Sequence, residues 1–246
     1  MAKQNIYDNE IFFDGYRQIR KNDGNANSLF EEPALISLLP DLGGKTVLDL
    51  GCGFGEHCLH FIQNGAKKVT GIDISKKMLD IAMAENSNSN ITYLNMPMEN
   101  ISELDEKFDV VVSSLALHYV EDYAGLIHNI YALLKEDGVF VFSQENPLNT
   151  SFSVGQRWTR DETGKKLFAN ISNYGIDGER ESVWFVDHVK KYHRTFSTII
   201  NTLIEEGFSI EKTLEPVPTK EILEKYPEYI DLFHKPDFLL VKAKKS

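Results

Sequence analysis

Residues 46–55, which read TVLDLGCGFG, constrain the fold of this 246-residue chain more than any other segment. A buried-type strand runs directly into glycines at alternate positions, Gly51, Gly53 and Gly55. Glycine reaches backbone angles that are closed to other residues and carries no Cβ, so such a turn can bring bare backbone against a nucleotide. The segment therefore predicts a strand-to-helix turn that binds a ligand.

Two acidic residues indicate which kind of nucleotide would bind. The dinucleotide fingerprint G-x-G-x-x-G requires glycine at position 56, where this chain has Glu56, and a phosphate site gains nothing from an acid there. Asp49, just before the loop, suits a cationic ligand better than a pyrophosphate. The segment resembles motif I of the class I S-adenosylmethionine-dependent methyltransferases, in which this loop holds the amino-acid end of the cofactor. The resemblance implies that S-adenosyl-L-methionine is bound by Asp49, Gly51, Cys52, Gly53 and Gly55.

A second acid, Asp73, ends the next predicted strand. It lies 22 residues after Gly51 (73 minus 51), close to the offset at which an acid grips ribose hydroxyls. Ser75 then caps a helix, which places Asp73 at the carboxyl end of a strand, where open α/β sheets bind ligands. A solvated turn acid is the alternative, but it does not explain why strand, glycine loop, helix and strand occur in one unit. We expect Asp73, with Ile74 and Met78 beside it, to bind the cofactor.

The charge balance and length are those of a globular enzyme. The chain has 26 Lys and Arg against 37 Asp and Glu, a net charge of −11, which argues against a broad surface for nucleic-acid phosphates. Short lysine pairs such as Lys190 and Lys191 are interpreted as solvated surface. No Pro-, Gly- or Ser-rich linker divides the chain, so we predict a single domain over 1–246.

The apolar pattern and the cysteines favour a reducing compartment. The first residues lack the apolar run of a signal peptide, and no stretch approaches the roughly 18 apolar residues of a membrane span. We therefore expect a cytoplasmic protein with no membrane partner. Cys52 and Cys58 are interpreted as small buried residues rather than a disulfide. Together with His57 and His60 they match none of the usual zinc spacings, so no metal is expected.

Strand-like runs alternate with helical patterns through the first 143 residues, which is typical of a parallel sheet with helices on both faces. An amphipathic helix that begins near Phe196 stops at Gly207, and two closing strands follow. The family that the chain resembles has a seven-stranded sheet with an antiparallel last strand. We predict a Rossmann-like, doubly wound α/β fold with strands at 46–50, 68–72, 91–94, 108–113, 139–143, 208–214 and 238–241.

Two segments depart from this alternation. Residues 147–190 follow the fifth strand and contain both tryptophans; the run 174–178, YGIDG, suggests a hairpin turn within a small aromatic sheet. We interpret this insertion as a substrate cap, with a simple cover for a sheet edge as the alternative. Residues 1–28 are dense in aromatic and basic side chains. The resemblance implies that they form a lid, with Tyr16 and Arg20 near the carboxylate of the cofactor; ordinary amphipathic packing is the alternative.

The resemblance implies further cofactor contacts after the third and fourth strands. Pro97 stands where many members carry an acid that holds the adenine, so Met98 and Glu99 are expected to take that role. Residues 108–119 resemble motif IV of the small-molecule branch, methyltransferase type 11, which includes the quinone-biosynthesis enzymes. The methionine part of the cofactor would then lie next to Ser113, Ser114 and Leu115.

Methyl transfer from a sulfonium is an in-line displacement, to which a protein contributes mainly alignment and the exclusion of water. A general base is needed only if the acceptor atom keeps its proton, and a carboxylate needs none. The candidates for a base are His118 after the fourth strand, Glu145 after the fifth, and Tyr192 with His193 before the amphipathic helix. For the histidines and tyrosine, structural hydrogen bonds are the alternative.

These features predict S-adenosylmethionine-dependent methyl transfer to a small organic acceptor. An NAD(P)-dependent oxidoreductase is one alternative, and Glu56 in place of the third glycine opposes it. A non-catalytic S-adenosylmethionine-binding subunit is another, weakly opposed by the intact polar residues Ser113, His118 and His193. The choice of acceptor lies in the insertion rather than in the common fold.

Overall fold

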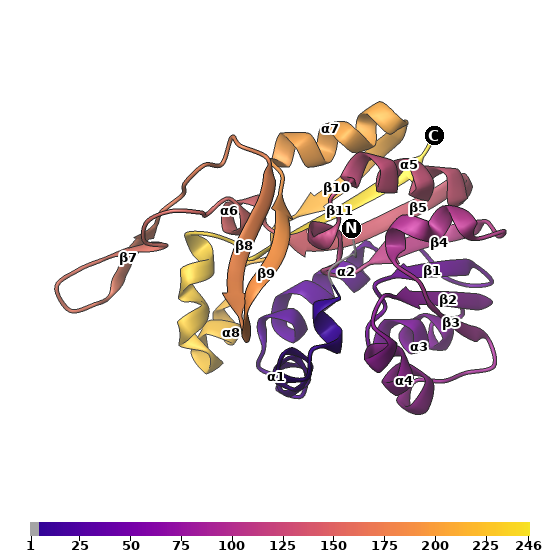
Figure 1. The fold of residues 1–246 in the computed structure, drawn as a ribbon, viewed down its shortest axis with the longest axis horizontal. Helices are drawn as coiled ribbons and strands as arrows, with labels where there is room; N and C mark the ends of the chain where they lie inside the picture. Colours follow the sequence, from indigo (N-terminus) through magenta and orange to yellow (C-terminus); the bar gives the residue numbers. More distant parts are fainter. Residues whose placement is uncertain (1–4) are drawn as a thin grey trace.

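The computed structural model describes residues 5–246, so the first four residues of the predicted lid segment 1–28 lie outside the described part. A central sheet is formed by β1 (Thr46–Leu50), β2 (Lys68–Asp73), β3 (Ile91–Asn95), β4 (Phe108–Ser113), β5 (Leu134–Glu145), β10 (Phe208–Leu214) and β11 (Phe238–Lys245). The strand order is β10-β11-β5-β4-β1-β2-β3 (Figure 1). Strand β11 is antiparallel to β5 and β10, and the other neighbours are parallel. The predicted seven-stranded sheet with an antiparallel last strand is confirmed.

The largest difference from the predicted strands is in β5, which begins at Leu134 rather than at Val139. Leu134 pairs with Phe108 and Val139 pairs with Val110, so the residues between them bulge out of register. Asp137 has a φ of 61° in this bulge. An apolar pattern cannot identify a strand start that a polar bulge interrupts.

Helices cover both faces of the sheet, as the alternation predicted (Figure 1). One face carries α5 (Tyr123–Leu133) and α7 (Phe196–Glu206), and the other carries α2 (Glu32–Leu38), α3 (Glu56–Gln63) and α4 (Lys76–Glu85). Strand β1 shows why. Leu48 and Leu50 point into the apolar cluster between the sheet and helices α5 and α7, while Val47 points into the cluster between the sheet and helices α2, α3 and α4. Because successive side chains of a strand alternate, a strand buried on both faces reads as a continuous apolar run.

The predicted cap at Ser75 and the predicted helix end at Gly207 are confirmed. The side chain of Ser75 accepts a hydrogen bond from the N–H of Met78 at the start of α4. Thr195 caps α7 in the same way, and Gly207, with φ of 110°, ends it. Gly207 suits this position because the left-handed conformation is costly for residues with a Cβ.

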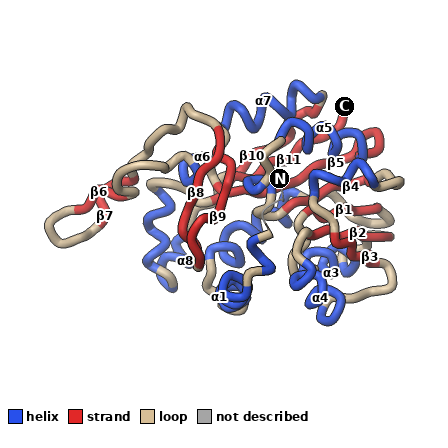
Figure 2. The backbone as a smooth tube through the Cα atoms, in the orientation of Figure 1, coloured by secondary structure: helices blue, strands red, loops and turns tan. Residues whose placement is uncertain are grey.

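The insertion forms two hairpins instead of one small sheet. A hairpin of β6 (Trp158–Arg160) and β7 (Lys166–Ala169) projects away from the body, and β8 (Gly178–Trp184) pairs with β9 (Val186–His193) above the N-terminal helix (Figures 1 and 2). The predicted hairpin turn at 174–178 is wrong, because the β8–β9 turn lies at Phe185, with φ of 59°. Residues 174–178 instead lead into β8 and are tied to the start of α7, where the Tyr174 hydroxyl accepts from the N–H of Phe196.

The N-terminal segment packs against the tip of the β8–β9 hairpin. It contains η1 (Ile6–Asp8), α1 (Glu10–Arg20) and a π-helical turn, η2 (Asn27–Glu31). The buried ring of Phe12 meets the rings of Trp184 and Phe185 edge to face, at centroid distances of 5.1 and 5.6 Å. A Cβ at Gly15 would lie 2.6 Å from the Phe185 ring, so glycine allows this close approach.

The remaining short elements connect these units: η3 (Met98–Glu103), η4 (Leu117–Tyr119), α6 (Pro147–Thr150), α8 (Lys220–Lys225) and η5 (Pro227–Phe233). Among residues 5–246, no helix has both the length and the apolar character needed to cross a membrane. The same residues contain no group of three or more His, Cys, Asp or Glu side chains placed to hold a metal ion.

Candidate functional site

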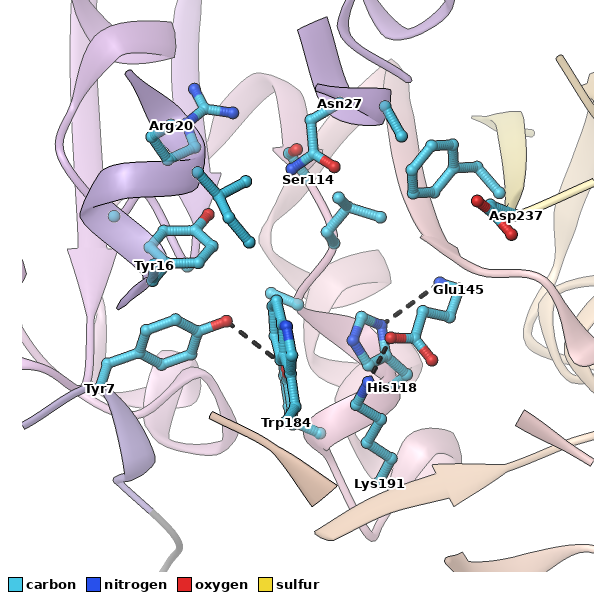
Figure 3. A pocket seen from close by; sticks show the side chains of 18 of the residues that line it. Tyr7, Tyr16, Arg20, Asn27, Ser114, His118, Glu145, Trp184, Lys191 and Asp237 are labelled. Carbon is cyan, nitrogen blue, oxygen red and sulfur yellow. Dashed lines mark hydrogen bonds and ion pairs between the residues drawn. The ribbon is translucent and has the colours of Figure 1, made fainter. Parts of the chain in front are cut away.

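A cavity with a volume of about 900 Å³ lies at the carboxyl ends of the parallel strands. The sheet, helix α1 and the β8–β9 hairpin enclose it, and Figure 3 shows its labelled side chains. Small-molecule sites span roughly 300 to 1,000 Å³, so this volume is near the upper end of that range. Of the predicted cofactor residues, those that line the cavity are Tyr16, Arg20, Gly51, Cys52, Gly53, Asp73, Ile74, Met78, Met98, Ser114 and Leu115.

The glycine loop is held against β2 and turned toward the cavity. The N–H groups of Gly51 and Cys52 both donate to the carbonyl of Ile72, each at 2.9 Å. Gly51, Gly53 and Gly55 have φ values of 73°, 53° and 77°. A Cβ at Gly51 would lie 2.7 Å from the Cβ of Ala116, whereas one at Gly53 would meet no atom within 4 Å. Glycine is thus required at 51 by protein packing, and at 53 the loop leaves open space for a ligand.

Asp73 links the loop to the end of β2. Its Oδ2 accepts from the N–H of Gly53 at 2.9 Å, and its Oδ1 accepts from the N–H of Ser75 at 2.8 Å. Burial raises the pKa of Asp73 to about 6. The carboxylate is therefore rigidly oriented at the cavity wall, with further lone pairs that can accept hydroxyl protons.

Asp49 lies beneath the loop rather than in the cavity wall. It is 1% exposed, and its Oδ2 accepts from the Cys58 thiol at 3.3 Å. Its Oδ1 has no hydrogen-bond partner among the described residues. Burial raises the pKa of Asp49 from 3.8 to about 7. A buried carboxylate of this kind places negative potential behind the loop, which suits a cationic ligand.

The raised pKa of Asp49 predicts a pH dependence of stability. Because the folded pKa lies above the unfolded value, this group's contribution to stability is present below about pH 4 and is lost as the pH rises through about 7. We expect the stability of ligand-free Asp49→Asn, relative to the unsubstituted protein, to rise by about 1.4 kcal/mol per pH unit from pH 5 to about pH 7 and then to level off, a gain of roughly 3 kcal/mol by pH 8. Urea unfolding of both proteins at pH 5 and pH 8 measures this. A stability difference that is the same at both would contradict it.

The remaining predicted contacts fall into two groups. Ser114 lines the cavity and donates to Glu31, whereas Ser113 is buried behind it and donates to the carbonyl of Leu50 at 2.9 Å. Asp49, Gly55, Glu99 and Ser113 do not line the cavity. The cavity wall next to these four residues is formed by their neighbours in the chain.

Glu31 is a residue that the sequence reasoning missed. It is 1% exposed, and its Oε1 accepts from the hydroxyls of Ser114 and Ser143. The Ser143 hydroxyl in turn accepts from the N–H of Leu115, which has a φ of 51°. Burial raises the pKa of Glu31 despite its hydrogen bonds. It secures the turn after β4, yet it precedes the first strand and has no motif that could have identified it.

Helix α1 contributes aromatic and basic side chains to the opposite wall. The Tyr16 ring lies 6.0 Å from that of Phe54 and 6.1 Å from that of Trp184. Arg20 forms an ion pair with Glu56 in the first turn of α3. Both predicted lid residues, Tyr16 and Arg20, therefore face the cavity (Figure 3).

The far end of the cavity holds His118, Glu145 and Lys191 (Figure 3). The Nδ1 of His118 accepts from the backbone N–H of Glu145 at 3.4 Å, and Lys191 forms an ion pair with the Glu145 carboxylate. Burial lowers the pKa of His118 to about 4. Burial alone would raise the pKa of Glu145, but the neighbouring His118 and Lys191 outweigh it and lower that pKa.

Lys191 corrects the sequence interpretation, which assigned it to solvated surface. Its side chain is 12% exposed, and its ammonium lies 5.1 Å from the centre of the Trp184 ring. Tyr192, predicted as a candidate base, does not line the cavity, because successive residues of β9 point to opposite sides.

His193 also lies outside the cavity wall, and both of its ring nitrogens are engaged. Its Nδ1 pairs with the Thr150 hydroxyl and its Nε2 with the carbonyl of Tyr174, each at 2.8 Å. It is fully buried at the base of the cap. The structural alternative considered for His193 therefore fits its position better than the role of a base.

Comparison with known proteins gives further evidence on the family to which this chain belongs. A family profile described as Methyltransferase domain matches residues 48–142. The crystal structure of an S-adenosylmethionine dependent methyltransferase from Mesorhizobium loti is 39% identical and covers 91% of this chain and 99% of that chain, with a TM-score of 0.81. A Listeria monocytogenes structure assigned to the same class is 41% identical and covers 88% of this chain and 96% of that one, with a TM-score of 0.80. The ubiquinone biosynthesis O-methyltransferase of Actinobacillus pleuropneumoniae is 40% identical over 43% of this chain and 47% of its own length.

Proposed function

This chain belongs to the S-adenosylmethionine-dependent methyltransferases, and from that membership we propose that it methylates a small organic acceptor inside the capped cavity. The observation that carries the proposal is that one cavity runs from Asp73 and the glycine loop to Glu145 and Lys191 beneath the β8–β9 hairpin. Its volume of about 900 Å³ leaves room for an acceptor beside the cofactor. The oxidoreductase and non-catalytic alternatives gain no support from these relatives.

The residues present fit the cofactor. We assign the ribose hydroxyls to Asp73, whose carboxylate is already oriented by two backbone N–H groups. The other assigned contacts are Gly51, Cys52 and Gly53 along the loop, Ile74 and Met78 beside the ribose, Met98 at the adenine, and Ser114, Leu115, Tyr16 and Arg20 at the methionine end. When bound, the sulfonium supplies a methyl carbon open to displacement, and these residues orient it and exclude water.

We further propose that residues 1–28 act as a lid and residues 147–190 as a substrate cap within a single domain, 1–246. The packing of Phe12 against Trp184 and Phe185 supports this, because it joins the two segments above the cavity. The cytoplasmic location predicted from the sequence stays a prediction.

Transfer of labelled methyl groups tests the proposal. The protein is incubated with S-adenosylmethionine labelled in its methyl group, together with separate small-molecule, protein and RNA fractions of a cell extract. We expect label to enter the small-molecule fraction, and to do so far more slowly with Asp73→Asn. Label that enters only protein or RNA would overturn the choice of acceptor. Absence of transfer to every fraction would overturn the proposed activity in this cavity.

A further inference from the structure

The acceptor end of the cavity presents hydrogen-bond donors rather than a base. From this geometry we infer that the acceptor is a small organic acid, methylated on an oxygen that is already ionised at neutral pH. The inference rests on the proposed function and adds to it the chemical class of the substrate.

His118 is arranged as a donor. Its Nδ1 accepts a hydrogen bond from the backbone N–H of Glu145, so the neutral ring carries its proton on Nε2. Within the described chain, Nε2 has no hydrogen-bond partner, and His118 lines the cavity. The charged groups that face it are Glu145 from β5, Lys191 from β9 and Arg194, which follows β9 directly, and burial keeps the pKa of His118 low. The imidazole can therefore donate to an acceptor oxygen but is poorly suited to take a proton.

Lys191 supplies positive charge at the same place. Its ammonium lies over the faces of the Trp184 and Tyr119 rings, at 5.1 and 6.0 Å from their centres. One of its three N–H donors serves the Glu145 carboxylate, and this ion pair neutralises the acid that would otherwise repel an anion. The remaining donors are available to an anionic oxygen.

Two guanidinium groups add positive charge to the cavity wall. Arg157 and Arg180 line the cavity, and neither forms an ion pair with a carboxylate in the described part of the chain. Arg157 stacks on the Phe152 ring at 4.6 Å, and Arg180 donates to backbone carbonyls, including that of Ile176. In a protein of net charge −11, unpaired guanidinium groups at a cavity favour entry of an anion.

Two carboxylates that line this part of the cavity already have side-chain partners. Glu145 is held by Lys191, and the Oδ1 of Asp237 accepts from the side-chain amide of Asn149 at 3.0 Å. The hydroxyls of Tyr7 and Tyr119 bond each other at 3.5 Å, and burial raises the pKa of both. An acceptor that must lose a proton before methyl transfer would have no well-placed base among these groups to take it, whereas an ionised acid has no proton to lose.

The step balances without proton transfer. A lone pair of the ionised acceptor oxygen forms the new bond to the methyl carbon as the carbon–sulfur bond breaks, and that electron pair returns to sulfur. The acid becomes a neutral methyl ester and the sulfonium a neutral thioether. Because opposite charges disappear together, a cavity that excludes water favours this transfer over one that creates charge.

Alkaline hydrolysis of the labelled product tests the inference. Methyl esters release volatile methanol in base, whereas methyl ethers and N-methyl groups do not. We expect most of the label in the small-molecule fraction to become volatile. Label that stays base-stable would overturn the inference while leaving the proposed methyl transfer intact. Absence of transfer would instead count against the proposed function itself, and the inference would fail with it.

Binding gives a readout that does not depend on turnover. With S-adenosylhomocysteine present, calorimetry compares small carboxylates with their primary amides, beginning with benzoate and benzamide. We expect carboxylates to bind more tightly by roughly tenfold or more, and Lys191→Gln to remove that preference. No preference for the carboxylate in any pair would contradict the inference.

Variants of His118 separate a donor from a base. Asparagine retains an N–H donor and cannot act as a base, so we expect His118→Asn to keep at least about tenfold more transfer than His118→Leu. We also expect kcat/KM for the acceptor, measured at saturating S-adenosylmethionine, to show no rise through neutral pH that depends on His118. A rise in kcat/KM through neutral pH, lost in His118→Asn, would show that this histidine takes a proton and would overturn the inference.

Discussion

Replacing Asp73 with asparagine is expected to weaken the binding of S-adenosylhomocysteine by about 10²-fold. The two charge-assisted hydrogen bonds from the ribose hydroxyls to the carboxylate would be lost, at roughly 1.5 kcal/mol each. The carboxylate accepts from the N–H groups of Gly53 and Ser75 and faces the cavity. An amide has one acceptor oxygen, so its NH₂ group would confront one of these backbone donors. The variant therefore loses both a partner for the ribose and part of the support of the glycine loop. Isothermal titration calorimetry measures the loss.

A matched variant controls for the change of charge. Asp80 lies on the neighbouring helix α4, is exposed, and pairs with Lys76 one turn away. Asp80→Asn removes the same charge at a distance from the cavity and should bind S-adenosylhomocysteine like the unsubstituted protein. Surface ion pairs of this kind contribute little to stability. If both variants lost affinity equally, or if Asp73→Asn bound normally, the assignment of the ribose to Asp73 would be abandoned.

Alanine at Gly53 is expected to weaken S-adenosylhomocysteine binding by at least about tenfold, since a methyl group forced into an occupied site costs roughly 1–3 kcal/mol. A Cβ at this position would meet no protein atom within 4 Å, and the residue lines the cavity. The protein itself therefore has space for the methyl group. Apart from the strain of the left-handed backbone, only a ligand that lies against the loop would conflict with it. Calorimetry measures affinity, and thermal unfolding of the ligand-free protein shows that the fold is kept.

Gly44 provides the control for backbone strain. It has a φ of 71°, and a Cβ there would also meet nothing within 4 Å, but it lies outside the cavity. Gly44→Ala and Gly53→Ala should lower the stability of the ligand-free protein by similar amounts, about 1 kcal/mol, because both force alanine into a left-handed conformation. Only Gly53→Ala should lose affinity. Equal affinities for the two variants would show that the bend at Gly53 does not contact the cofactor.

Much of the fold could be predicted because its determinants are local. The strands 46–50, 108–113 and 208–214 begin and end where the apolar pattern placed them, and the caps at Ser75 and Gly207 were visible in single residues. The insertion was harder, because its glycines fit several turns. The β8–β9 turn lies at Phe185 rather than at any of these glycines, and the Phe185 ring packs against Gly15, a contact between segments far apart in the chain.

The candidate site also has one part that could be predicted from the sequence and one part that could not. Asp73 and the glycine loop follow from one strand, one turn and a fixed offset, and the structure places Gly51, Gly53 and Asp73 at the cavity wall. At the other end, the choice among candidate bases could not be made from the sequence. His193 and Lys191 differ by two positions, yet one is enclosed by Thr150 and Tyr174 and the other reaches Glu145.

The sequence by itself determined the α/β class, the nucleotide-binding turn and the acid at the end of β2, since backbone conformation over a few contiguous residues is governed by those residues. Tertiary structure alone decided that Lys191 enters the cavity, that Tyr192 does not, and that Glu31 supports the turn after β4. The physical reason is strand register and long-range packing. A shift of one residue along β9 would turn each of its side chains to the opposite face, and no local pattern records which face the rest of the protein will cover.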